Sequence, residues 1–136
     1  MTTEPEMPRF NLESVTAGDD CAVIQITGEV DVYTAPQLRE RVVELIGSGF
    51  IHLIADLRDV EFLDSTGLGA LVGSLRRVRV HDGSLMLVTD SPRILEIFKI
   101  TGLNSAFAMY PAISEAVDAS PAWRSAVAHT DNPLFS

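Results

Sequence analysis

Asp64-Ser65-Thr66-Gly67-Leu68-Gly69-Ala70-Leu71 is the stretch that decides the fold, because one pattern ends just before it and another starts inside it. Residues 52–57 form an apolar run that is typical of a strand. Apolar residues then recur at helical spacing from Leu68 to Val78. The stretch therefore predicts a junction between a strand and a helix, with a hydroxyl residue where the helix begins.

Ser65 has two interpretations at such a junction. The first backbone N–H groups of a helix lack partners inside it, and a Ser or Asp side chain commonly caps them. The same groups and the helix dipole favour negative charge, so a hydroxyl there can also carry a phosphate. Gly67 and Gly69 each cost about 1 kcal/mol relative to Ala in a helix. Because glycine is unfavourable here, its presence indicates that the helix backbone must approach closely either the sheet or another molecule.

Strands and helices alternate on both sides of this junction. We expect an edge strand from Phe10 to Val15, followed by strands at 21–27, 51–57, 84–88 and 107–109 and helices at 35–47, 65–80, 92–100 and 111–119. Thr34 and Ser91 are the expected caps of two of these helices. The order predicts a single α/β domain with a mixed sheet of four to five strands and about four helices.

Three ranges divide the chain. Residues 1–8 are interpreted as a flexible lead-in, residues 9–119 as the domain, and residues 120–136 as a C-terminal tail that could be disordered. The tail has no clear period, although Trp123 and the Leu134–Phe135 pair could pack back onto the body.

Composition and charge exclude several classes of protein. The net charge of -9 argues against binding to nucleic acid or to an anionic membrane surface, since both favour basic patches. No apolar run is long enough to span a membrane. Cys21 is the single cysteine, so no intrachain disulfide forms and a cytoplasmic location is expected. The three histidines are scattered without ligand spacing, so we expect neither a metal nor a cofactor.

Acidic residues follow two of the expected strands. Asp31 and Asp56 each lie at or near a strand end, and such ends gather at one edge of a parallel sheet. Each taken singly is more often a turn or cap residue. Together with Asp64 they could surround Ser65 as a recognition surface. A dinucleotide loop, a serine hydrolase and a phosphate-accepting receiver domain fit less well, because their other required residues are missing.

The motifs Gly28-Glu29-Val30-Asp31, Leu53-Ile54-Ala55-Asp56-Leu57 and Val60-x-Phe62-x-Asp64-Ser65-Thr66-Gly67-Leu68-Gly69 closely resemble the anti-sigma factor antagonists, the bacterial STAS domains. The resemblance covers residues 9–118 and excludes the C-terminal tail. It implies a regulatory binding protein and not an enzyme. Two alternatives stay open: a STAS subunit of a larger signalling complex, and a small α/β enzyme with Ser65 as its nucleophile.

The resemblance also implies partners and site residues. An anti-sigma factor with serine-kinase activity would phosphorylate Ser65, with Thr66 as the second candidate, and a serine phosphatase would reverse the reaction. The unphosphorylated form would bind the kinase and free the sigma factor. The residues expected to contact the partner are Asp31, Asp56, Asp64, Thr66, Gly67, Leu68 and Gly69.

Overall fold

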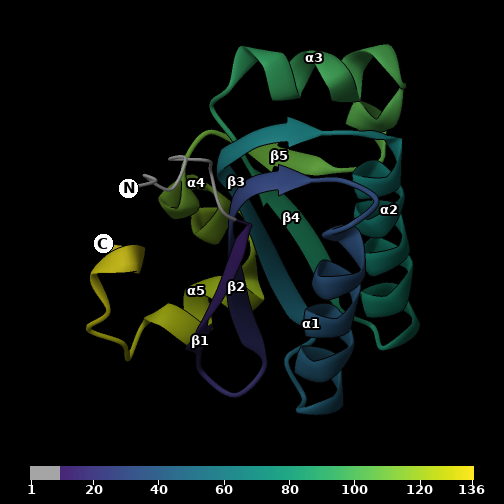
Figure 1. The fold of residues 1–136 in the computed structure, drawn as a ribbon. Helices are drawn as coiled ribbons and strands as arrows, with labels where there is room; N and C mark the ends of the chain where they lie inside the picture. The colour runs from purple at the N-terminus through teal and green to yellow at the C-terminus, as the bar shows by residue number, and fades with distance from the viewer. Residues whose placement is uncertain (1–9) are drawn as a thin grey trace, which may run out of the picture.

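Five strands pair in one mixed sheet in the computed structural model, which describes residues 10–136 (Figure 1). They are β1 (Asn11–Ala17), β2 (Cys21–Val30), β3 (His52–Leu63), β4 (Ser84–Val88) and β5 (Ala108–Tyr110), and they lie in this order across the sheet. β1 is antiparallel to β2, and every other neighbouring pair is parallel. The expected lead-in, residues 1–8, lies outside the described residues.

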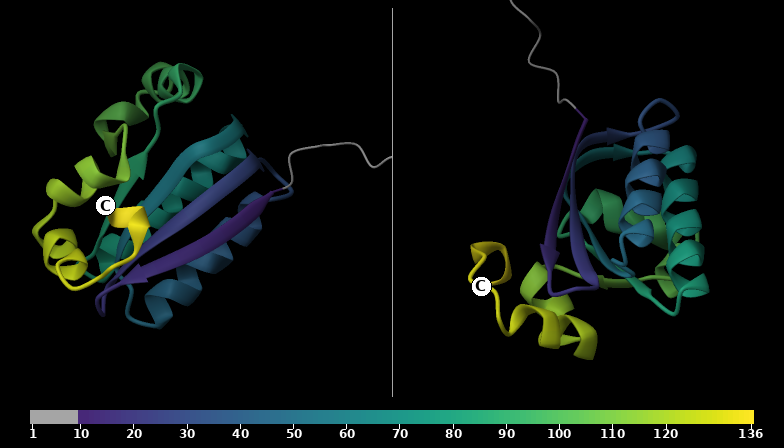
Figure 2. Two further views of the ribbon diagram at one scale, coloured as in Figure 1. Left: turned by 90° about the vertical axis from the view of Figure 1, so that its left-hand side faces the viewer. Right: turned by 90° about the horizontal axis from the view of Figure 1, so that it is seen from below.

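Helices cover both faces of this sheet. They are α1 (Ala35–Gly47), α2 (Ser65–Val80), α3 (Pro92–Ile100), α4 (Ile113–Asp118) and α5 (Pro121–Val127), with short 3₁₀ turns at Leu103–Ser105 and Pro133–Phe135. Figures 1 and 2 show α1 and α2 side by side on one face and α4 and α5 on the opposite face. The prediction of an α/β domain with a mixed sheet of four to five strands is confirmed.

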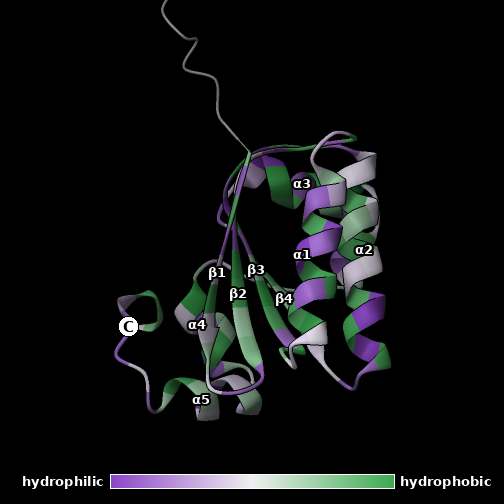
Figure 3. Ribbon diagram, turned by 60° about the horizontal axis from the view of Figure 1, so that its bottom comes forward, coloured by the Kyte–Doolittle hydropathy of each residue, from purple (hydrophilic) through white to green (hydrophobic). Residues whose placement is uncertain are grey.

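Alternation along the strands divides the core between the two faces. In β2, Ala22 and Ile24 pack toward α1 and α2, whereas Cys21 and Val23 pack toward α4 and α5. Figure 3 shows apolar strands at the centre, with polar residues on the outer side of α1 and on the last turns of α2. Both faces of the sheet are therefore buried, as parallel sheets require.

β2 and β3 extend beyond the predicted ends at residues 27 and 57. β4 pairs with β3 only as far as Asp56, and the rest of β3 pairs with β2 alone. Irregular register near Gly28, whose φ is 98°, accompanies this extension. The longer strands carry the chain directly to the start of α2.

The segment after Ser120 contains a helix, which its weak period did not predict. The Ser120 side chain caps α5 by accepting a hydrogen bond from the backbone N–H of Trp123. The Trp123 ring is completely buried and lies 5.8 Å from the ring of Phe135. Trp123 packs with Val23 and Ile54 in the cluster on the sheet face that α4 and α5 cover, so it does pack back onto the body of the domain. Residues 120–136 are therefore not a free tail, while the domain boundary at 119 stays a prediction.

Cys21 belongs to the same cluster and is buried. Burial, aided by the neighbouring Asp20 carboxylate, raises the pKa of the Cys21 thiol to about 12. The group is therefore a protonated packing element at neutral pH.

Among the described helices, none is both long enough and apolar enough to cross a bilayer.

Candidate functional site

Ser65 is the first residue of α2, and its side chain is exposed. The cap of this helix is Asp64, whose carboxylate accepts a hydrogen bond of 2.9 Å from the backbone N–H of Gly67. The interpretation of Ser65 as the cap is therefore incorrect, because Asp64 caps the helix. Its hydroxyl stands at the positive end of the helix without a capping role. Thr66, the second candidate acceptor, is half-buried.

The glycines of the junction have different surroundings. A Cβ atom on Gly67 would lie 2.5 Å from the carbonyl oxygen of Val30, so only glycine lets α2 begin against the end of β2. At Gly69, apart from its chain neighbours and the adjacent backbone of α2, no atom of residues 10–136 comes within 4 Å of the Cβ position, and the residue is exposed. Leu68 is buried in the core. Gly67 and Leu68 are thus buried and serve packing, and direct partner contact by any residue from Thr66 to Gly69 stays a prediction.

Asp31 organises the loop between β2 and α1. Its carboxylate accepts hydrogen bonds from the backbone N–H groups of Tyr33 and Thr34, at 2.9 and 3.1 Å. The Thr34 hydroxyl lies 3.2 Å from the same carboxylate oxygen and donates to the carbonyl of Glu29. Thr34 precedes α1 as expected, but its side chain braces the loop and does not cap the helix. Asp31 thus fixes the conformation of the two residues that follow it.

Val32 and Tyr33, the two residues after Asp31, are exposed apolar residues that the sequence patterns did not reveal. Val32, Tyr33 and Phe62 are 55%, 83% and 47% exposed. Phe62 is the neighbour of Glu29 in the β2–β3 ladder, and the backbone N–H of Asp64 donates to the carbonyl of Val30. These contacts bring the β2–α1 loop, the end of β3 and the start of α2 together. We call Val32, Tyr33 and Phe62 with Ser65 the Ser65 edge.

Asp56 is held elsewhere. It lies seven residues before the end of β3, about 20 Å back along an extended strand. It is 4% exposed, and both carboxylate oxygens accept hydrogen bonds of 2.9 Å from the Arg58 guanidinium. This pairing with Asp56 raises the pKa of Arg58 above its ordinary value. The structure therefore brings Asp31 and Asp64 to the Ser65 edge, while a role for Asp56 in binding stays a prediction.

The histidines lie away from the Ser65 edge. His52 is the first residue of β3, at the opposite end of that strand, and its Nδ1 lies 2.9 Å from the Ser84 hydroxyl. His81 follows the last residue of α2, and His129 follows α5. Ser65 thus has no histidine positioned to act as its base. Within residues 10–136, no group of three or more His, Cys, Asp or Glu side chains is arranged to hold a metal ion.

Comparisons of the sequence and of the structure with known proteins both find anti-sigma factor antagonists and STAS domains. A family model described as the STAS domain matches residues 14–116. The anti-sigma-B factor antagonist of Bacillus subtilis (strain 168) is 48% identical over 81 residues, which is 60% of this chain and 73% of that protein.

Two solved structures of SpoIIAA, an anti-sigma factor antagonist and Bacillus cell fate determinant, are also similar. The unphosphorylated form has a TM-score of 0.69 and 28% identity, covering 82% of this chain and 95% of that one. The phosphorylated form has a TM-score of 0.63 and 28% identity, covering 82% and 98%.

Proposed function

Because this chain belongs to the STAS domain family, we propose that it is an anti-sigma factor antagonist controlled by phosphorylation of Ser65. The unphosphorylated form binds an anti-sigma factor that is also a serine kinase, and this binding frees the sigma factor. Phosphate on Ser65 ends the binding, and a serine phosphatase restores it. The relatives support this reading, since one is an anti-sigma-B factor antagonist and another has been solved in phosphorylated and unphosphorylated forms.

The observation that carries the proposal is the exposed Ser65 hydroxyl at the start of α2. Asp64 already supplies the cap, so a phosphate can be added to Ser65 without removing a bond that the fold needs. The free N–H groups of the first turn and the helix dipole tolerate the added charge. Phosphorylation can therefore change the surface while the domain stays folded.

The effect on a partner is electrostatic and steric. A phosphate adds about -1.5 to -2 charges at neutral pH. It joins the Asp64 carboxylate and the exposed Glu29 and Glu61, which already make this edge acidic. A partner that covers the edge meets the new charge beside these groups. Each loss of about 1.4 kcal/mol weakens binding tenfold, and a poorly paired charge in an interface costs more.

The apolar side chains supply the attraction. Exposed aromatic residues at a functional edge are typical anchors of a protein interface. Tyr33 is the most exposed of the three, and Asp31 holds its backbone in place before any partner arrives. We assign the main contact to Tyr33, with Val32 and Phe62 beside it. Asp31 then acts through the loop that it orders.

A phosphorylation assay tests the proposal. The protein is incubated with its anti-sigma factor kinase and labelled ATP, and the modified peptide is mapped by mass spectrometry. We expect one phosphate on Ser65, no labelling of Ser65→Ala, and normal labelling of Thr66→Ala. Labelling of Ser65→Ala, or a phosphate found on Thr66 in the wild type, contradicts the assignment.

A further inference from the structure

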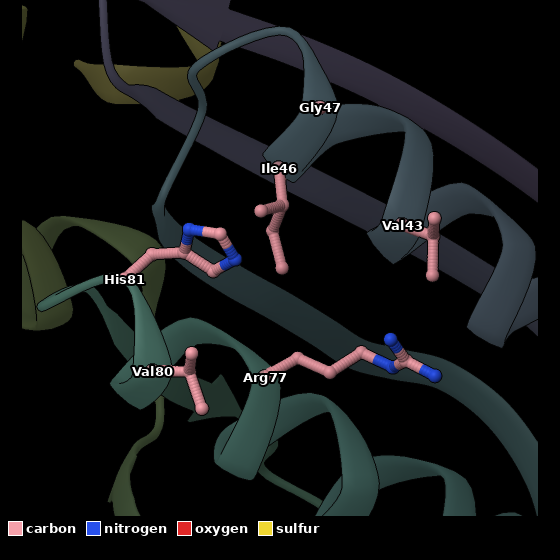
Figure 4. A pocket seen from close by; sticks show the side chains of 6 residues that line it. All are labelled: Val43, Ile46, Gly47, Arg77, Val80 and His81. Atoms are coloured by element: carbon pink, nitrogen blue, oxygen red, sulfur yellow. The ribbon is translucent and has the colours of Figure 1, made fainter.

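A second surface feature lies between the C-terminal turns of α1 and α2. Val43 and Ile46 on α1 and Val80 on α2 line a groove, in which the Arg77 side chain lies opposite Val43 and the His81 ring lies beside Ile46 (Figure 4). Val43 is 46% exposed and Val80 is 79% exposed. We call this feature, with Gly47 at its end, the α1–α2 groove.

Positive charge gathers beside the groove in an otherwise acidic protein. Arg76, Arg77 and Arg79 are three of the ten Lys and Arg residues in a chain of net charge -9. All three are exposed, and none lies within ion-pair distance of a carboxylate among residues 10–136. Cations in the last turn of a helix gain about 0.3–1 kcal/mol from its dipole. That gain explains charge at this place, but not the exposed apolar floor next to it.

The groove is remote from the Ser65 edge. Ser65 is the first residue of α2 and Val80 is the last, so they are fifteen positions apart along the helix. At 1.5 Å per residue they lie about 22 Å apart along the helix. This distance exceeds the screening length of about 8 Å at physiological salt. A phosphate on Ser65 therefore leaves the field at the groove almost unchanged.

We propose that the α1–α2 groove binds an acidic, amphipathic helical segment of a partner protein in both phosphorylation states of Ser65. The apolar side chains of the segment would lie on Val43, Ile46 and Val80. Its carboxylates would accept two parallel hydrogen bonds from the Arg77 guanidinium and would pair with Arg76 beside the groove. Charge complementarity selects this occupant, because arginines spread over several positions match a row of carboxylates better than a single small anion.

The probe is a fluorescein-labelled 16-residue peptide of Leu, Glu and Ala, with Leu at helical spacing on one face and Glu beside it. We expect fluorescence anisotropy to show saturable binding to the full chain. Amide shift changes in NMR spectra should fall on residues 43–47 and 76–81. Arg77→Glu and Val80→Asp should each weaken binding at least tenfold, and Ser65→Asp should change it less than twofold.

Lys99→Glu is the matched control, since it makes the same charge change on an exposed cation of α3. An equal loss in Lys99→Glu and Arg77→Glu would mean nonspecific attraction and would overturn the proposal. Absence of binding at millimolar peptide would also overturn it. So would a dimer in sedimentation that Arg77→Glu dissociates, because a second copy would then be the occupant. Thermal melts confirm that each variant is folded.

Discussion

The Ser65 edge and the sheet face beneath α5 both contain aromatic and aliphatic side chains, but these are exposed at the edge and buried beneath α5. At the edge, Val32, Tyr33 and Phe62 are exposed, while the side chains of Asp31 and Thr34 are paired within the loop. Beneath α5, Trp123 is fully buried, and its Nε1 group has no hydrogen-bond acceptor among the described residues.

The difference separates binding from stability. Burial of a tryptophan ring stabilises a fold enough to outweigh an unpaired N–H, which costs about 1–3 kcal/mol. Apolar groups left in water contribute little to the fold, so we expect those of the Ser65 edge to act in contact with another molecule. Substitutions beneath α5 should therefore change the free energy of unfolding, whereas substitutions at the Ser65 edge should change the affinity for a partner.

Trp123→Ala should have the largest effect. Loss of the buried ring should lower the free energy of unfolding by about 3–5 kcal/mol, measured by urea denaturation. Trp123→Phe should cost much less, because it keeps an aromatic ring and removes the unpaired N–H. Tyr33→Ala, an aromatic truncation at the edge, should change stability by less than about 0.5 kcal/mol. The comparison fails if Tyr33→Ala destabilises the chain as much as Trp123→Ala.

Gly67→Ala should come next. Its new Cβ would meet the Val30 carbonyl oxygen at 2.5 Å, and forced repacking of this kind costs about 1–3 kcal/mol. Gly69→Ala has open space and should gain up to about 1 kcal/mol from helix propensity. Denaturation curves of the two variants should therefore shift in opposite directions. Shifts of the same sign would mean that Gly69 also has a packing role.

Tyr33→Ala should weaken binding to the anti-sigma factor by about 2 kcal/mol, or roughly thirtyfold. Titration calorimetry with the unphosphorylated protein measures this loss. Tyr33→Phe should bind almost normally, since the ring is what the partner buries. Unchanged binding of Tyr33→Ala would remove the apolar anchor from the account while leaving the phosphorylation of Ser65 untouched.

The smallest effects concern the start of α2. Asp64→Ala removes the cap and should cost about 1 kcal/mol in a thermal melt. Ser65→Ala and Ser65→Asp should change stability by less than about 0.5 kcal/mol, because Ser65 is not the cap. Only Ser65→Asp should weaken partner binding, and only partly, since it carries one charge and a smaller head than phosphate. If Ser65→Ala costs as much as Asp64→Ala, the hydroxyl has a structural role after all.

Local patterns predicted the order of strands and helices because each element carries its own signal. Ser91 followed by Pro92 starts α3 as expected, and Ser91 accepts a hydrogen bond from the backbone N–H of Ile94. The end of β3 was missed because pairing with β2 alone is set by neighbouring strands and not by local sequence. Helix α5 was missed although Ser120 and Pro121 repeat the start signal of α3, because its seven residues show no clear apolar period.

The sequence predicted where the candidate site lies in the fold, and the roles of its residues stay predictions. Ser65 and Asp31 are distinctive in sequence, and the structure places both at one edge of the sheet. Exposure of Tyr33 and the pairing of Asp56 with Arg58 depend on the folded chain, so no pattern of residues revealed them. Asp64 and Ser65 can both cap a helix, and which of them does so depends on the residue at which the helical backbone begins. The sequence does not determine that residue.

The closure of the sheet by α5 has a consequence for biosynthesis. Gly18 in the β1–β2 turn lies against Ala126, and Cys21 contacts the carbonyl of Ala122, 101 residues further along the chain. A face that includes β1 and β2 is thus covered by a helix that is translated about a hundred residues later. Until then Val23, Ile54 and Val88 lack the part of their cover that α5 supplies, and chains with exposed apolar surface tend to associate. Nascent chains stalled before residue 121 should therefore recruit chaperones that completed chains release.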